Sequence, residues 1–160
     1  IEYKLKKDKF VRCIKTDELS LSKFGKFKMH IYKNLIDGTE HLVLVRGKIT
    51  SDENILVRMH SLNIFSDLLD TKNKDLEKSI AMISKTNKGV IVIIRNPKKE
   101  LKRKELKDYH KNTQILKEYG VGAQILIDLG IKKVTLLTRS SKNIVGIDGF
   151  GLEINGTKKI

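Results

Sequence analysis

YGVGAQILIDLGIKKVTLLT, residues 119–138, carries the succession of helix and strand that decides the fold. Within it, the apolar residues of Gly122–Leu129 are spaced as on one face of a short helix. Gly130 follows at once, and glycine is the common residue just after the last turn of a helix. Val134–Leu137 is a short apolar run that predicts a buried strand. A helix that leads directly into a buried strand is typical of layered α/β domains.

The region before this stretch predicts another buried strand and two helices. Gly89–Ile94 (GVIVII) is apolar throughout, which is typical of a strand covered on both faces. Pro97 ends that strand, and the charged run Lys98–Tyr119 is poor in turn residues, so we predict a long exposed helix there. Leu76–Thr86 has apolar residues at helical spacing and predicts a second helix.

The first half of the chain predicts antiparallel strands. Phe24–Tyr32 is expected to be a strand, and the runs His41–Gly47 (HLVLVRG) and Ile55–His60 (ILVRMH) are rich in β-branched residues. The turn residues SDEN separate these two runs and predict an antiparallel hairpin. Ile144–Leu152 suggests a helical turn that leads to a last strand, Gly151–Ile154. The fold class expected is therefore α/β, a layered mixed β-sheet with flanking helices.

Composition limits the partners. The chain has 160 residues and a formal net charge of +14, which attracts polyanions. Lysine is spread along the whole chain, which favours solvated lysine faces, and aromatic residues for stacking on bases are few, so no nucleic-acid partner is expected. No apolar run approaches the roughly 18 residues of a membrane span, so we expect no membrane partner and a cytoplasmic location. The single cysteine, Cys13, excludes an internal disulfide and a metal site of several cysteines.

Four stretches, in order, resemble the GTP cyclohydrolase II family of riboflavin biosynthesis. The longest, residues 119–138, nearly matches the family's Y-G-I-G-A-Q-I-L-x-D-L-G-V-x-x-I-x-L-L-T. The others are IEYKLKKDKFVRC with LSKFGKF at 1–13 and 21–27, EHLVLVRGKI with LVRMHS at 40–49 and 56–61, and GIDGFGLEI at 146–154. The resemblance implies a GTP cyclohydrolase II-like sheet and helices over most of the chain.

The resemblance also implies a domain organisation. The opening residues resemble the connector that leaves the 3,4-dihydroxy-2-butanone 4-phosphate synthase half of bifunctional riboflavin proteins. We therefore expect a connector over residues 1–20 and a GTP cyclohydrolase II-like domain over residues 21–160. Because the first residue is Ile1 rather than Met, we expect a longer protein with a synthase domain upstream. The family commonly forms homodimers, so a homodimer is implied.

The activity that the resemblance implies is a zinc-dependent opening of the imidazole ring of GTP, with release of formate and pyrophosphate. In the family three cysteines hold the zinc, which activates a water. Here Leu62 stands in place of the family's Glu, and Asn63 in place of the first cysteine. Asp67 matches the acid that follows, but residues 67–74 are too few to hold the other two cysteines. An amide cannot replace a thiolate, so we expect neither zinc nor catalytic residues.

The phosphate-binding region departs from the family as well. Arg95 is retained, but the family's Gln-Glu-Gly-Arg run is replaced by one that begins Asn96-Pro97. Proline fixes φ and removes an N–H, so the loop geometry of the family cannot persist unchanged. Ile115 and Lys117 stand where the family has an Asp and an Arg. Ile can neither accept a proton nor orient a base, and Lys lacks the planar fork of Arg.

Four residues remain as candidates for holding the phosphates of a nucleotide: Arg58, Arg95, Thr138 and Lys142. Mg²⁺ is expected only if a nucleotide binds, and no other cofactor is expected. Thr138 can equally cap a turn, and Lys142 can equally be a surface lysine. We interpret His60 as a strand-end histidine held by hydrogen bonds, because no partner ligand for a metal stands near it in the sequence.

Three functions remain open at this point. The first is a catalytically inactive cyclohydrolase-like domain that acts in dimerisation, support or regulation of a fused synthase. The second is a nucleotide-binding enzyme of altered, zinc-free chemistry with His60 as base, for which no complete set of nucleophile, base and orienting group can be assembled. The third is a basic nucleic-acid-binding module built on Lys98–Lys107, which a steep salt dependence of binding would reveal.

Overall fold

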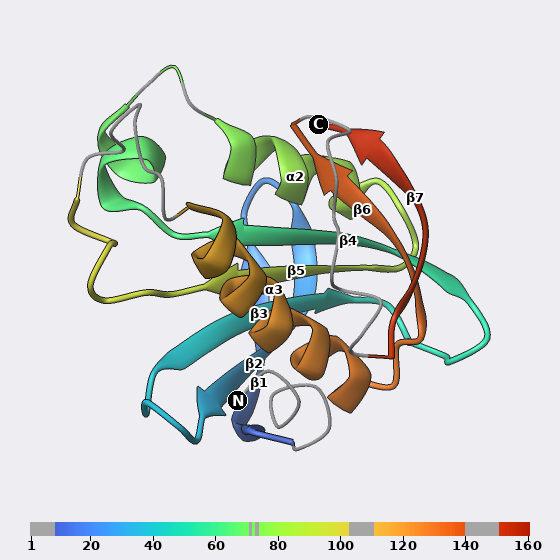
Figure 1. Cartoon of the computed structure of the whole chain (residues 1–160). Coiled ribbons are helices and arrows are strands. Elements are labelled where there is room, and N and C mark those ends of the chain that lie inside the picture. The colour runs from blue at the N-terminus through green and yellow to red at the C-terminus, as the bar shows by residue number, and fades with distance from the viewer. Residues whose placement is uncertain (1–8, 71, 73, 103–110, 140–150) are drawn as a thin grey trace.

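The computed structural model describes residues 9–70, 72, 74–102, 111–139 and 151–160, and of residues 111–117 only the backbone. In this part of the chain, seven strands form one mixed sheet in the order β1-β2-β3-β5-β4-β6-β7 (Figure 1). The strands are β1 (Val11–Leu21), β2 (Gly25–Asn34), β3 (Glu40–Arg46), β4 (Asn54–Ser61), β5 (Gly89–Ile94), β6 (Lys133–Thr138) and β7 (Glu153–Lys159). The helices are α2 (Asp75–Ser84) and α3 (Lys111–Asp128), and η1 (Phe65–Leu69) is a short π-helical turn. The predicted α/β fold with a mixed sheet is confirmed.

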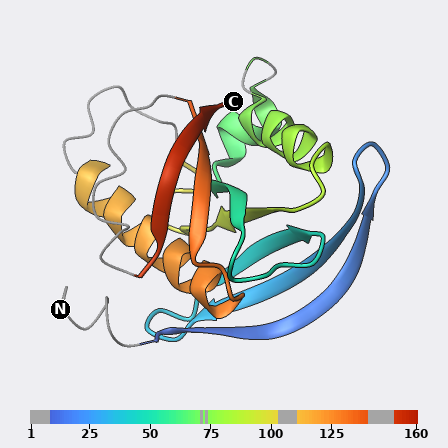
Figure 2. The same ribbon diagram turned by 90° about the vertical axis from the view of Figure 1, so that its right-hand side faces the viewer.

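Helices cover the two faces of this sheet. Figure 2 shows α2 on one side of the central strands and α3 on the other. The core under α3 includes Val57, Val92 and Ile125, and the core under α2 includes Ile83 and Ile91. Every residue of β5 is buried, which confirms the prediction that GVIVII lies in a sheet covered on both faces.

The predicted hairpin between His41–Gly47 and Ile55–His60 is wrong. β5 lies between β3 and β4, pairing antiparallel with β3 and parallel with β4. The reason is that β5 is apolar on both faces and therefore takes a central place. The chain reaches it from β4 through α2, which is the crossover that a parallel pair of strands requires.

The predicted pair of helices around residue 120 is also corrected. Segment 96–102 forms turns rather than helix, with the N–H groups of Lys99 and Glu100 both donating to the carbonyl of Asn96. α3 then runs unbroken from Lys111 to Asp128, so the separately predicted helix is its second half. Gly122 does not begin a helix; it allows close packing, because a Cβ there would lie 2.9 Å from the sulfur of Met59.

Three further boundaries follow from the structure. Residues 11–20 of the expected connector belong to β1, which pairs along its length with β2. Gly130 has φ +88°, so the predicted glycine end of the helix is confirmed. The last strand begins at Glu153 and pairs in parallel with β6, whereas the helical turn predicted within residues 144–152 lies mostly outside the described residues. No described helix is both long enough and apolar enough to cross a membrane.

Candidate functional site

The carboxyl ends of the parallel strands β5, β4 and β6 lie at one edge of the sheet. In open α/β sheets, ligands bind outside this edge. Arg58 lies near the end of β4, Arg95 directly follows β5, and Thr138 is the last residue of β6. The structure therefore places three of the four candidate residues at this edge, and the fourth, Lys142, lies outside the described residues.

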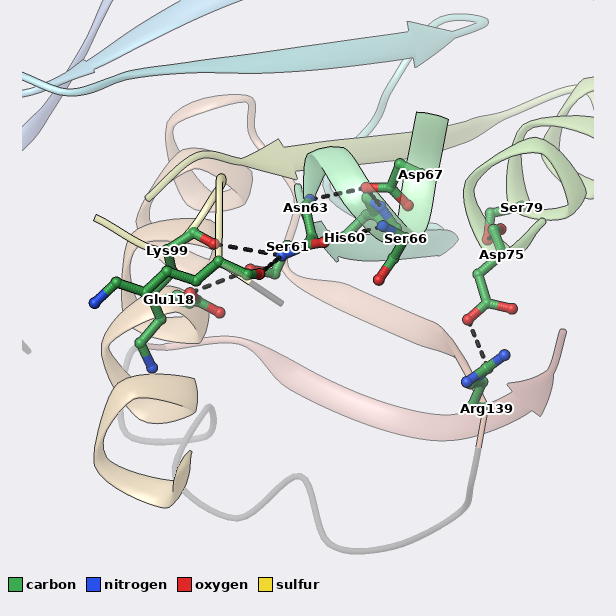
Figure 3. Close-up of polar contacts among 11 residues, drawn as sticks. His60, Ser61, Asn63, Ser66, Asp67, Asp75, Ser79, Lys99, Glu118 and Arg139 are labelled. Carbon is green, nitrogen blue, oxygen red and sulfur yellow. Dashed lines mark hydrogen bonds and ion pairs between the residues drawn. The ribbon is translucent and has the colours of Figure 1, made fainter. Parts of the chain in front are cut away.

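His60, at the end of β4, is held by a buried carboxylate. Its imidazole Nε2 lies 2.8 Å from Asp67 Oδ2, and the two side chains are 7% and 4% exposed (Figure 3). The same carboxylate oxygen accepts the backbone N–H of Asn63 at 2.9 Å. The interpretation of His60 as a hydrogen-bonded strand-end histidine is confirmed. Sequence analysis did not identify Asp67 as its partner, because only the turn η1 folds this residue back toward the strand.

Arg95 is already paired with an anion from its own chain. Its Nε donates to Glu100 Oε1 at 2.9 Å, and a second guanidinium nitrogen lies 3.5 Å from Glu100 Oε2. Glu100 is only 9% exposed. Arg95 also lines a surface cavity of about 310 Å³ with residues 37–40 of the β2–β3 turn. An external phosphate would have to compete with the Glu100 carboxylate and face the acidic residues of that turn, Asp37 and Glu40.

Arg58 of β4 reaches the end of β6, where Thr138 lies. A guanidinium nitrogen of Arg58 donates to the carbonyl of Leu137 at 3.1 Å, and its buried Nε has no hydrogen-bond partner among the described residues. Burial lowers the pKa of Arg58 from its ordinary value, and the nearby Asp75 opposes that effect. Thr138 follows Leu137 and accepts the backbone N–H of Ile160. Arg58 therefore bonds beside Thr138, whereas Arg95 follows β5, on the opposite side of β4 from β6.

Two polar pairs that sequence analysis missed complete this edge. Asp75, the first residue of α2, lies 2.6 Å from Arg139 and is 12% exposed. Ser61, at the end of β4, donates to Glu118 of α3 at 3.2 Å. The only signal for the first pair is an acidic residue at a helix N-terminus, which the helix dipole favours in any protein. Both pairs place carboxylates where a nucleotide would bring negative charge.

The residues present do not fit the zinc of the resembling family. Asn63, at the place of the first cysteine, is 6% exposed, and its carboxamide is bonded to backbone groups. Cys13 lies on β1, which β2, β3 and β5 separate from β4. Among the described residues, no group of three His, Cys, Asp or Glu side chains is placed to hold a metal ion. A neutral amide and one distant thiol do not make the thiolate-rich set that such a zinc requires.

A buried histidine near Arg95 makes the stability of the fold depend on pH. His41 is 3% exposed, and its Nδ1 accepts the backbone N–H of Arg95 at 3.0 Å, so its ring is neutral. Burial is the largest cause that lowers the pKa of His41 from 6.5. The pKa of His41 is lower in the folded than in the unfolded protein, so the neutral ring favours the folded state. This contribution to stability is fully present above the unfolded pKa and is lost as the pH falls from the unfolded pKa through the folded pKa.

We therefore expect the urea concentration at the unfolding midpoint of the wild type to decrease when the pH is lowered from about 7.5 to about 5. His41→Gln keeps an oxygen that can accept the same N–H but cannot take up the proton, so its midpoint should fall less. His30, whose pKa burial also lowers, is present in both proteins and cancels in the comparison. An equal fall in wild type and variant would show that His41 does not contribute.

Comparison with known proteins gives the family. The model of the GTP cyclohydrolase II family matches residues 12–159. The riboflavin biosynthesis protein RibBA of Aquifex aeolicus is 35% identical over 96% of this chain and 43% of its own length. RibBA of Synechocystis is 34% identical over 96% of this chain and 32% of its own length. The monofunctional riboflavin biosynthesis protein RIBA 2 of Arabidopsis thaliana, a chloroplastic protein, is 33% identical over 98% of this chain and 35% of its own length.

A solved structure supports the same fold. RibBX, a two domain 3,4-dihydroxy-2-butanone 4-phosphate synthase from A. baumannii, superposes with a TM-score of 0.67 at 24% identity. The match covers 98% of this chain and 43% of that one. This chain thus spans less than half the length of each of these relatives. With the family model matched along nearly its whole length, the chain belongs to the GTP cyclohydrolase II family.

Proposed function

We propose that this chain is a GTP cyclohydrolase II-like domain of riboflavin biosynthesis that has no cyclohydrolase activity of its own. Its role is to support or regulate a 3,4-dihydroxy-2-butanone 4-phosphate synthase in the same protein, with dimerisation as one means. The observation that carries the proposal is Asn63, which stands buried and fully hydrogen-bonded where the family places a zinc-binding cysteine. Without a metal to activate water, the ring-opening hydrolysis has no nucleophile.

The charges at the edge of the sheet support the same conclusion. Arg95 is neutralised by Glu100, and Arg139 by Asp75. Catalysis and tight binding of phosphates need cationic side chains that are free to face the ligand. Each of these two guanidinium groups instead has an internal carboxylate within hydrogen-bond distance. A cyclohydrolase would need both its metal and its phosphate clamp; among the described residues no group is placed to hold a metal, and Arg95 and Arg139 are both paired with carboxylates.

The synthase as partner is supported by the relatives. RibBX is by its description a two domain 3,4-dihydroxy-2-butanone 4-phosphate synthase, and this chain matches 43% of its length. The RibBA proteins likewise extend well beyond the part that this chain matches. A domain whose core strands persist while its chemical groups are lost is expected to serve its neighbour through contact rather than through chemistry.

The proposal is tested on the gene product that carries both domains. Incubation with GTP, Zn²⁺ and Mg²⁺ should release no formate above the level without protein, and elemental analysis should find zinc far below one atom per chain. Synthase activity should remain. Removing the domain described here should lower the thermal midpoint or the activity of the synthase, because the contacts that support it are lost.

The matched control is a second protein in which the domain is present and only the turn at residues 96–102 is altered. Glu100→Gln serves this purpose, because the Glu100 carboxylate bonds to Arg95 of the same domain. Stoichiometric zinc with formate release would overturn the inactive assignment. Synthase behaviour identical with and without the domain would overturn the supporting role.

A further inference from the structure

Every polar atom of the Asn63 side chain is engaged by the backbone. Its Nδ2 donates to the carbonyl of Lys102 at 2.7 Å and to that of Lys99 at 3.3 Å. Its Oδ1 accepts the N–H of Ser66 at 3.0 Å. Because the residue is 6% exposed, these three bonds satisfy a group that would be costly to bury unpaired. The side chain thus joins two loops that are far apart in sequence.

A second layer of bonds fixes Asn63 itself. Its backbone N–H donates to Asp67 Oδ2, which also receives the N–H of His60. The backbone N–H of Asp67 donates back to the carbonyl of Asn63 at 2.9 Å. We call this set, His60, Asn63, Asp67 and the carbonyls of Lys99 and Lys102, the Asn63 clasp. Charge-assisted bonds to a buried carboxylate are among the stronger hydrogen bonds in proteins.

The loop that the clasp holds is the closing segment, residues 96–102. One backbone bond, from the N–H of Ile64 to the carbonyl of Glu100 at 2.9 Å, joins the same two loops beside the clasp. The closing segment also brings the Glu100 carboxylate onto Arg95. The clasp, by holding this segment, therefore also holds the Glu100 carboxylate on Arg95. Release of the segment would also release Glu100 from Arg95.

We infer that the Asn63 clasp replaces a metal ion as the element that fixes the carboxyl edge of β4 and β5, so that the domain closes and folds without zinc. A metal joins loops through several protein ligands at once. The clasp instead joins its two loops through the carboxamide of Asn63, whose Nδ2 donates and whose Oδ1 accepts hydrogen bonds. The inference concerns the chain's own fold and holds whether or not a synthase is its partner.

The test uses hydrogen exchange at two amides that report different bonds. The Ser66 N–H is bonded to Asn63 Oδ1, and the Ile64 N–H reports whether the closing segment stays docked. In Asn63→Ala, both amides should exchange at least about tenfold faster, and the thermal midpoint should fall by roughly 3 °C or more. In Asn63→Asp, which keeps the acceptor but loses the two donated bonds, Ile64 should exchange faster while Ser66 stays protected.

Asn54→Ala is the matched control, because Asn54 is an exposed asparagine at the start of β4 whose carboxamide donates to Thr135 of β6 at 2.7 Å, away from the clasp. It should leave both reporter amides unchanged. Asn63→Cys restores the family's first ligand and should behave like Asn63→Ala, with no rise in thermal midpoint on adding Zn²⁺. Unchanged exchange at Ile64 in both Asn63→Ala and Asn63→Asp would overturn the inference. A fall in the wild-type midpoint after dialysis against a chelator would overturn it as well.

Discussion

Replacing Gly47 by alanine is expected to lower the free energy of unfolding by about 2–5 kcal/mol. Gly47 directly follows β3 and has φ +78°, a conformation that residues with a Cβ adopt only at a cost. A Cβ at this position would also lie 2.1 Å from the carbonyl oxygen of Asn87, so the backbone before β5 would have to move. Urea unfolding of wild type and variant at the same pH measures the difference.

Gly38→Ala separates the two causes. Gly38 has φ +77°, almost the same as Gly47, but a Cβ there would meet nothing within 4 Å. This variant should therefore show only the conformational cost, about 1–2 kcal/mol. If the two variants were equally destabilised, the contact with Asn87 would not matter, and the residue after β3 would pack more loosely against the turn before β5 than the structure indicates.

The parts of the fold that the sequence predicts well are those decided by local pattern. Gly89–Ile94 is apolar at every position, and it forms a strand that is buried on both faces. Leu76–Thr86 shows helical spacing, and α2 covers nearly the same residues. Strand neighbours are a different matter. β5 enters between β3 and β4 through a crossover, and no pattern in His41–Gly47 or Ile55–His60 records that later insertion.

The sequence predicts which chemical groups of the family are missing from the candidate site, but not the hydrogen bonds and ion pairs that take their place. Comparison with a family motif at Asn63 indicates which chemical group is missing, because it needs one position only. The hydrogen bonds of Asn63 depend on the folded structure, because its side chain donates to carbonyls 36 and 39 residues away in the sequence. The pairing of Arg95 with Glu100 depends in the same way on the turn that Asn96 begins. A backbone carbonyl is present at every residue, so the sequence does not show which carbonyls a distant side chain will reach.

The packing of α2 on the sheet provides the second large effect. Ile83 is fully buried against β5, and a Cβ at Gly89 would lie 2.6 Å from Ile83 Cγ2. Ile83→Ala should cost about 2–5 kcal/mol, because it removes buried methyl groups and leaves a cavity. Gly89→Ala should cost about 1–3 kcal/mol, because the added methyl has no room. Both are measured by urea unfolding.

The double variant Ile83→Ala with Gly89→Ala tests whether these costs share one contact. The methyl added at position 89 enters the space that the isoleucine leaves, so the double variant should be destabilised by less than the sum of the single ones, by about 0.5–3 kcal/mol. Ile83→Ala with Gly38→Ala is the control pair and should be additive, because a Cβ at Gly38 has no neighbour. Additivity in both pairs would mean that Ile83 lies farther from position 89 than the 2.6 Å between its Cγ2 and a Cβ at Gly89 implies. Since α2 also carries the Asp75 that neutralises Arg139, such a result would require a new description of that side of the site.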